Sequence, residues 1–183
     1  MNTAVSIDQP LPGAILPKWW TGEPAIDPAL FSIDCSELDM TEAALDPDGE
    51  LAVQMNRIFD EIGLVYLTNT GLRDLQAMRV ISQHVIKHEI DYKGGANPRN
   101  NLQPNVYEVG APLEAHLHYH HEMAYIDKST RMLAFLCDKA ADDGGQTFVS
   151  DNVRATDALL ATDFGQKLKE LGLCYHRHLT DRM

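Results

Sequence analysis

Apolar side chains recur at helical spacing in "ELAVQMNRIFDEIG", residues 50–63. Residues three and four apart share one face of a helix, so the spacing predicts an apolar stripe facing a core. Glycine often ends a helix, and Gly63 follows the pattern directly. The organised part of the chain is therefore expected to begin near Gly49 with an amphipathic helix. Its stripe would hold Leu51, Met55, Ile58, Phe59 and Ile62.

The next two segments predict a short buried strand at "LVYLTNT" and a second helix over "LRDLQAMRVISQHVIKHEI", residues 72–90. On this helix His84 and His88 would lie four residues apart, which is the spacing of a helical metal pair. No acid or cysteine accompanies them in a recognisable pattern. We interpret both as surface or half-buried histidines rather than as ligands.

Residues 1–48 are rich in proline and acidic residues. A long helix is excluded there because proline removes a backbone donor and clashes with the preceding turn. The prolines that exclude it are Pro10, Pro12, Pro17, Pro24 and Pro28. We interpret this part as an irregular N-terminal arm, with Trp19 and Trp20 as anchors that pin it onto the body. Residues 49–183 would form the domain proper.

Beyond the second helix, the proline- and glycine-rich stretch "YKGGANPRNNLQPN" predicts a long loop. Strands are expected around residues 115–125, 132–138 and 146–150. Two short helices follow, the first capped by Ser150 or Asp151 and the second by Thr162 or Asp163. "LCYHRHL" then restarts a strand. This order indicates an α+β domain with helices on one side, not a doubly wound nucleotide-binding fold.

The composition and charge of the chain disfavour several classes of partner. The 183 residues suit one domain or most of one, and 27 acidic against 15 basic side chains give a net charge of −12. That balance disfavours nucleic acid and anionic membranes as partners. No apolar run is long enough to cross a bilayer. The three cysteines are far apart and form no CxxC pair, which favours reduced thiols in a cytoplasmic protein.

The stretch "HLHYHHEMAY", residues 116–125, carries the candidate chemistry. On an extended strand, alternate residues share a face, so His121 would point away from the face that carries the other three histidines. The shared face would hold His116, His118, His120 and Glu122. Burying three imidazoles and a carboxylate is costly without a partner, and a divalent transition metal is such a partner.

The residues leave three interpretations open. His120 and Glu122 can be the H-x-E pair of a two-histidine, one-carboxylate site for Fe(II). Alternatively His116, His118 and Glu122 can bind metal as in cupins, since "GAPLEAHLHYHHE" fits the first cupin motif. That motif then requires a glycine where Ser129 stands, and a later PxG…H block is absent. The third interpretation is a histidine-rich strand without metal.

Neighbouring segments carry a family resemblance. "HHEMAY" resembles the H-x-[DE] segment of the taurine dioxygenase-like (TauD/TfdA) family, in the branch that uses glutamate. "LAFLCDKAADDGGQTFVSD" resembles the strand, loop and G-G-x-T strand that follow in that family. Thr147 lies 27 positions after His120, about the family's separation. "YKGGANPR" resembles a loop upstream of the metal strand, so the resemblance runs from about Gly63 to the end.

The resemblance implies a double-stranded β-helix (jelly roll) with flanking helices and an Fe(II)/2-oxoglutarate-dependent dioxygenase activity. His120 and Glu122 would be iron ligands, and Thr147 would hydrogen-bond a carboxylate of 2-oxoglutarate. His118 and Tyr125 would be pocket residues. The reaction would use O₂ and hydroxylate a C–H bond of a small, amino-acid-like substrate. Arg99 and Asn101 are also candidate pocket residues, and we interpret both as structural.

The family's second histidine ligand and its 2-oxoglutarate arginine are not found. Both belong well downstream of G-G-x-T, yet only 36 residues follow Thr147. His176 and His178 fall in what resembles the family's central strand. We therefore expect the chain to be the N-terminal part of the oxygenase domain, ending about halfway through the jelly roll. It would be a fragment, the product of a disrupted gene, or a short form that pairs with another chain. A non-catalytic remnant is the alternative to an enzyme.

Overall fold

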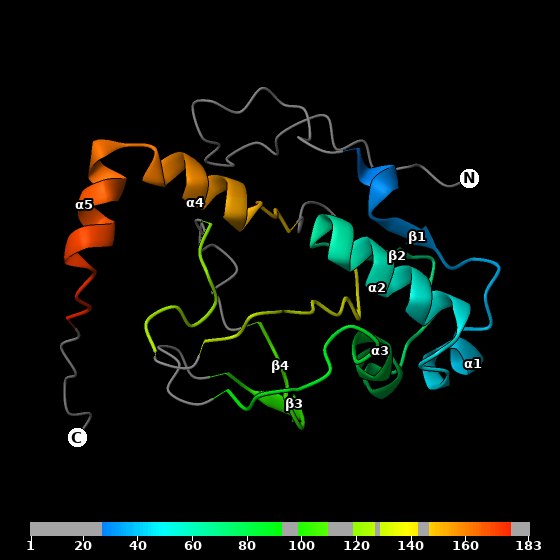
Figure 1. Cartoon of the computed structure of the whole chain (residues 1–183). Helices are drawn as coiled ribbons and strands as arrows, with labels where there is room; N and C mark the ends of the chain where they lie inside the picture. Colours follow the sequence, from blue (N-terminus) through cyan, green and yellow to red (C-terminus); the bar gives the residue numbers. More distant parts are fainter. Residues whose placement is uncertain (1–26, 93–98, 110–118, 127–128, 143–146, 177–183) are drawn as a thin grey trace, which may run out of the picture. The chain divides into compact units, whose positions relative to one another are not determined.

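The computed structural model describes residues 27–92, 99–109, 119–126, 129–142 and 147–176 (Figure 1). The chain divides into two compact units, the first formed by residues 1–118 and 130–146, the second by residues 119–129 and 147–183. The described elements are η1 (Pro28–Leu30), β1 (Ser32–Asp34), α1 (Met40–Leu45), α2 (Glu50–Ile62), β2 (Tyr66–Thr68), α3 (Leu75–Ser82), β3 (Asn101–Gln103), β4 (Val106–Tyr107), α4 (Asn152–Leu160) and α5 (Asp163–Leu171).

Helix α2 is the centre of the first unit and confirms the helix expected from the apolar stripe. Leu51, Met55 and Ile58 are buried in the core. The helix ends at Gly63, whose φ of 82° is left-handed and whose N–H donates to Phe59 O at 2.8 Å. Glycine adopts this conformation without the steric cost that a side chain would bring, so the expected stop is also confirmed.

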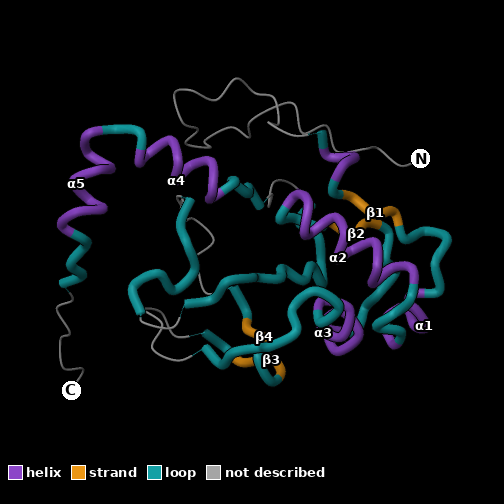
Figure 2. The backbone as a smooth tube through the Cα atoms, in the orientation of Figure 1, coloured by secondary structure: helices purple, strands orange, loops and turns teal. Residues whose placement is uncertain are grey.

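Regular structure begins earlier than Gly49. Strand β1 pairs in parallel with β2 (Figure 2), with Ile33 opposite Leu67. A parallel pair requires a long crossover, and here α1 and α2 supply it. Both strands therefore pack at the same core as α2, with Ile33 of β1 buried and Leu67 of β2 partly buried against it. The buried members of this core are Ile33, Cys35, Met40, Ala44, Leu51, Met55, Ile58 and Ile81. The boundary expected between residues 48 and 49 stays a prediction, and Trp19 and Trp20 lie outside the described residues.

Helix α3 is shorter than expected, because it ends at Ser82 rather than near residue 90. After it, His84 N donates to Ile81 O and Val85 N to Ser82 O, so the chain tightens into i→i−3 turns. His84 and His88 are therefore not a helical pair. The expectation of a surface or half-buried His84 is wrong: it is 3% exposed and its Nε2 lies 3.0 Å from Ala43 O. His88 is exposed, as expected.

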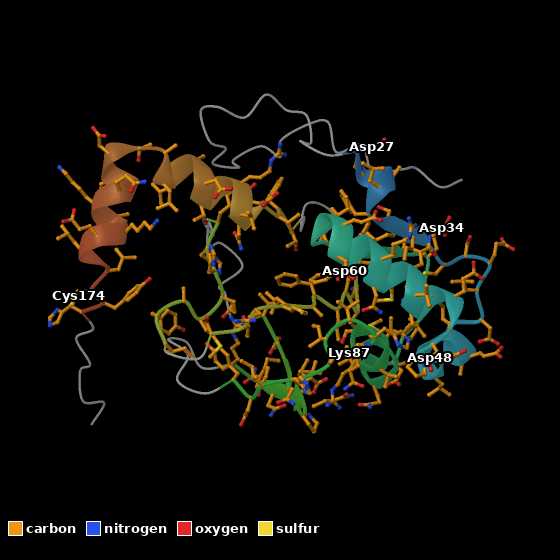
Figure 3. The ribbon with its side chains drawn as sticks, viewed as in Figure 1. Asp27, Asp34, Asp48, Asp60, Lys87 and Cys174 are labelled. Carbon is orange, nitrogen blue, oxygen red and sulfur yellow. The ribbon has the colours of Figure 1, made fainter. Side chains whose placement is uncertain are left out.

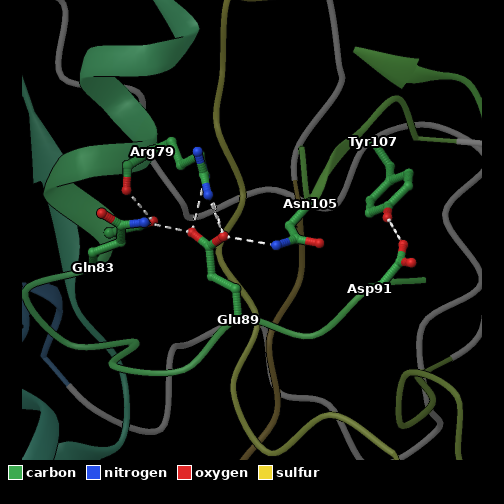
Figure 4. A network of polar contacts seen from close by, with 7 residues as sticks. Arg79, Gln83, Glu89, Asp91, Asn105 and Tyr107 are labelled. Carbon is green, nitrogen blue, oxygen red and sulfur yellow. Dashed lines mark hydrogen bonds and ion pairs between the residues drawn. The ribbon is translucent and has the colours of Figure 1, made fainter. Parts of the chain in front are cut away.

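A carboxylate-centred network joins α3 to the chain beyond it (Figure 4). Arg79 donates to the Glu89 carboxylate from Nε at 3.0 Å and from Nη2 at 2.5 Å. Gln83 and Asn105 donate to the same carboxylate at 2.8 and 2.9 Å. The Arg79 guanidinium, with the other donors, lowers the pKa of Glu89 to about 2. Four donors on one carboxylate fix the turn that carries Asn105 against α3.

The segment expected to be a loop contains a small hairpin. Strands β3 and β4 pair antiparallel, with Asn101 opposite Tyr107. Asn105 makes the turn between them with a φ of 61°, a left-handed conformation that asparagine tolerates better than most residues. The Tyr107 hydroxyl donates to Asp91 Oδ1 at 2.6 Å (Figure 4). The same hydroxyl accepts from Tyr92 N at 3.0 Å. This part of the loop prediction is wrong.

Two helices dominate the second unit, as the sequence predicted. Asp151 caps α4 by accepting from Val153 N and Arg154 N. Thr162 caps α5 by accepting from Gly165 N at 3.0 Å. The helices approach so closely that a Cβ on Gly165 would lie 2.0 Å from Leu159 O. None of the helices in the described parts has the length and apolar character that crossing a bilayer requires.

The strands expected around 115–125, 132–138 and 146–150 are not formed by the described residues of those ranges, and neither is the one expected to start at Leu173. A strand exists only where a neighbour satisfies its backbone groups, and β-propensity alone does not supply one. Apolar side chains of these segments are exposed, Phe135 by 60% and Phe148 by 45%. The mixed α and β content is confirmed. The described sheets are two-stranded and form no closed barrel, so the jelly roll stays a prediction.

Candidate metal centre

His120 and Glu122 meet on a short segment of the second unit. His120 Nε2 lies 4.0 Å from Glu122 Oε2, and the side chains are 57% and 16% exposed. Residues 122–125 form a turn, and Ile126 N donates to Met123 O at 3.2 Å. Met123 is 3% exposed and occupies the left-handed region, with a φ of 56°. The buried methionine therefore fixes the turn beside the two polar groups.

This geometry corrects the expectation of an extended strand through residue 125. Glu122 already belongs to the turn, so strand alternation does not place its carboxylate beside the His120 imidazole. The segment "HEMAY" carries no turn signal, because it contains no glycine, proline or asparagine. Sequence reasoning therefore missed Met123, whose left-handed backbone costs about 1–2 kcal/mol and must be offset by its burial.

The two groups fit the first half of a metal site. Imidazole nitrogen and carboxylate oxygen are ligands that suit a divalent transition metal. With bonds of about 2.1 Å, adjacent ligand atoms lie about 3 Å apart, so the pair must close by about 1 Å on binding. The exposed His120 side chain can make that movement by rotation. Within the described part of the chain, no group of three histidine, cysteine or acidic side chains could hold a metal.

Some of the other candidate site residues lie within the described part of the chain and some do not. His116 and His118 lie outside the described residues, so the cupin ligand set is not tested. Thr147 belongs to the same unit as His120 and Glu122 and is exposed. Among the residues that the structure describes, no hydrogen bond joins Thr147 to either of them. Tyr125 is half-buried in the turn region.

Arg99 and Asn101 belong to the first unit. The Arg99 guanidinium lies 4.6 Å from the centre of the Tyr92 ring, and Asn101 pairs with Tyr107 across the hairpin. A cation over an aromatic face gains about 0.5–2 kcal/mol, which holds the arginine in place. These contacts support the structural interpretation of both residues.

Comparison with known proteins decides the family. Residues 27–182 match the family described as "Taurine catabolism dioxygenase TauD, TfdA family", which covers most of the chain. The chain belongs to the TauD/TfdA family. The family resemblance is thereby confirmed, and the match extends to residues before Gly63. Members of the TauD/TfdA family are typically 2-oxoglutarate-dependent dioxygenases that use Fe(II), and the family implies a jelly-roll fold.

A curated relative supports the family assignment. The chain is 33% identical over 94 residues to a clavaminate synthase-like protein of Arabidopsis thaliana. This alignment covers 50% of the chain but only 28% of the relative. No solved structure matches the chain. The relative therefore supports a dioxygenase-type family, not a particular substrate.

Proposed function

We propose that this protein acts in Fe(II)/2-oxoglutarate-dependent C–H hydroxylation of a small, amino-acid-like substrate. The observation that carries the proposal is the His120–Glu122 pair, 4.0 Å apart in the family's H-x-E position. When bound, iron with 2-oxoglutarate and O₂ supplies oxidative decarboxylation, which releases succinate and CO₂ and oxidises the substrate.

The residues of this chain have separate tasks in the proposal. His120 offers a neutral imidazole nitrogen, and Glu122 offers a carboxylate that neutralises part of the metal charge. Met123 holds the turn that keeps the two groups adjacent. Thr147 would donate its hydroxyl to a carboxylate of 2-oxoglutarate. That role rests on the family's G-G-x-T position.

The test is iron-dependent release of succinate from 2-oxoglutarate by the protein, with product measured by mass spectrometry. The wild-type chain should form succinate only with Fe(II) and O₂. His120→Ala and Glu122→Ala should abolish it, whereas Thr147→Ala should raise the 2-oxoglutarate concentration needed. His121→Ala is the matched control, because it removes a neighbouring exposed imidazole and should leave turnover unchanged.

Two outcomes would contradict the proposal. One is an iron-loaded wild-type chain that forms no succinate. The other is equal loss in His121→Ala and His120→Ala. Loss with His118→Ala but not with His120→Ala would favour the cupin ligand set of His116, His118 and Glu122.

A non-catalytic remnant or interaction module is the alternative to an enzyme. A chain that folds but takes up no iron in calorimetry would support this remnant or interaction module.

A further inference from the structure

A hollow of about 230 Å³ lies in the first unit between β1, the loop after it and the start of α2. Its floor is apolar: Ile33 and Leu51 are buried, and Leu38 is 41% exposed. Its rim is acidic and is formed by Asp34, Glu37 and Glu50. Figure 3 labels Asp34 at the end of β1.

The size and charge of the hollow limit what can occupy it. Pockets for small-molecule ligands usually measure about 300–1,000 Å³, so this one suits a side chain better than a co-substrate. Asp34 already accepts from Ser36 N and Asn69 Nδ2. Among the described residues, no hydrogen bond or ion pair engages the carboxylates of Glu37 and Glu50. The complementary occupant is therefore a large apolar side chain next to a positive charge.

The chain itself contains such a segment in "ILPKWW", residues 15–20, which lies outside the described residues. Trp19 and Trp20 supply the apolar surface. Lys18 is the one lysine or arginine in residues 1–26. Eight residue steps separate Trp20 from Pro28, and an extended chain spans about 26 Å over that number. Strand β1 begins four residues later, so the segment can reach the hollow.

We propose that residues 15–20 dock in this hollow, with one indole against Leu38, Ile33 and Leu51 and Lys18 at the rim of Glu37 and Glu50. Docking removes the exposed part of Leu38 from water and places the one basic side chain of the arm among carboxylates. It fastens the proline-rich arm to the sheet and helix of the first unit, independently of the proposed enzyme activity.

Tryptophan fluorescence tests the docking directly, because Trp19 and Trp20 are the only tryptophans of the chain. In the full wild-type chain the emission should be blue-shifted, and acrylamide should quench it less than after urea unfolding. Leu38→Ser should lower the ratio of docked to undocked residues 15–20 by about tenfold, since it removes a half-exposed apolar contact. The double change Glu37→Gln with Glu50→Gln should lower it by about two- to fivefold.

The controls separate docking from folding. Glu61→Gln changes an exposed acid of the same helix outside the hollow and should leave quenching unchanged. Lys18→Gln should remove the salt dependence of quenching. Circular dichroism must show that each variant keeps the wild-type helix content, and Leu38→Ala replaces Leu38→Ser if it does not.

Three results would overturn the proposal. The first is wild-type quenching equal to that of the unfolded chain. The second is protected tryptophans that respond to none of the hollow variants, which would place the segment elsewhere. The third is protection that disappears on dilution, which would show that the segment docks on a second copy.

Discussion

At the level of single residues, specific contacts explain why His84 is buried although the sequence pattern predicts a surface or half-buried position. His84 was expected near the surface, but its ring contacts Ala43 O and its own carbonyl accepts from Asn56 Nδ2 at 3.0 Å. It therefore links α1 and α2 to the turn after α3. The pattern could not show this, because the contact joins residues 41 positions apart in the chain.

His84→Ala should lower the free energy of unfolding by about 2 kcal/mol, because it leaves Ala43 O without a donor and opens a buried space. Urea unfolding followed by circular dichroism measures this loss. His88→Ala removes an exposed imidazole four residues on and should change stability by less than about 0.5 kcal/mol. Equal effects of the two changes would contradict the burial of His84.

Glu89 gives the second residue-scale prediction. Glu89→Gln should cost about 1 kcal/mol of unfolding free energy at neutral pH, since the pair with Arg79 is only partly screened. The pKa of Glu89 is lowered from 4.5 to about 2, mainly by Arg79. Its contribution is therefore complete above the unfolded value and is lost as the pH falls from 4.5 towards 2.

Unfolding free energies of wild type and Glu89→Gln, measured from pH 7 downwards, should converge in that window. Glu61→Gln, an exposed acid without a described hydrogen bond, should show no such convergence. A difference between wild type and Glu89→Gln that is constant with pH would contradict the role of the ionised carboxylate.

At the scale of elements, helices were predicted better than strands. Periodicity and caps found α2, α4 and α5, because a helix satisfies its own backbone and its signals are local. Strand β1 was missed since "SID" lies in a proline- and acid-rich region and is stabilised by β2, far along the chain. The strand expected at 132–138 was predicted from its apolar residues alone, without a neighbouring strand to pair with. Its apolar residues have no described partner strand.

The close approach of α4 and α5 gives the element-scale prediction. In an ordinary helix, Gly→Ala stabilises by about 1 kcal/mol. At Gly165 the added Cβ would lie 2.0 Å from the backbone oxygen of Leu159, so the sign reverses. Gly165→Ala should destabilise the helix pair by about 1–3 kcal/mol. Thermal unfolding followed by circular dichroism measures it, and exposed Lys167→Ala should be neutral.

At the scale of the whole molecule, the family was recognisable from short motifs although the fold was not derivable from them. "HHEMAY" and "GGQT" identified the TauD/TfdA family, which the match over residues 27–182 confirms. The described elements form two small sheets and five α-helices, and family membership rather than their arrangement implies the jelly roll. The role of His120 and Glu122 as metal ligands stays a prediction, and the structure shows only their proximity. His120 and Glu122 are adjacent, but a turn rather than a strand brings them together.

We propose that His120 and Glu122 bind the metal, and anaerobic Fe(II) titration by calorimetry is the direct measurement of that binding. Wild type and His121→Ala should bind one Fe(II) with the same affinity. His120→Ala and Glu122→Ala should each weaken binding by at least about tenfold, because loss of a ligand costs no less than loss of its outer-shell support. Iron binding that is unchanged in both variants, or weakened equally by His121→Ala, would contradict the account.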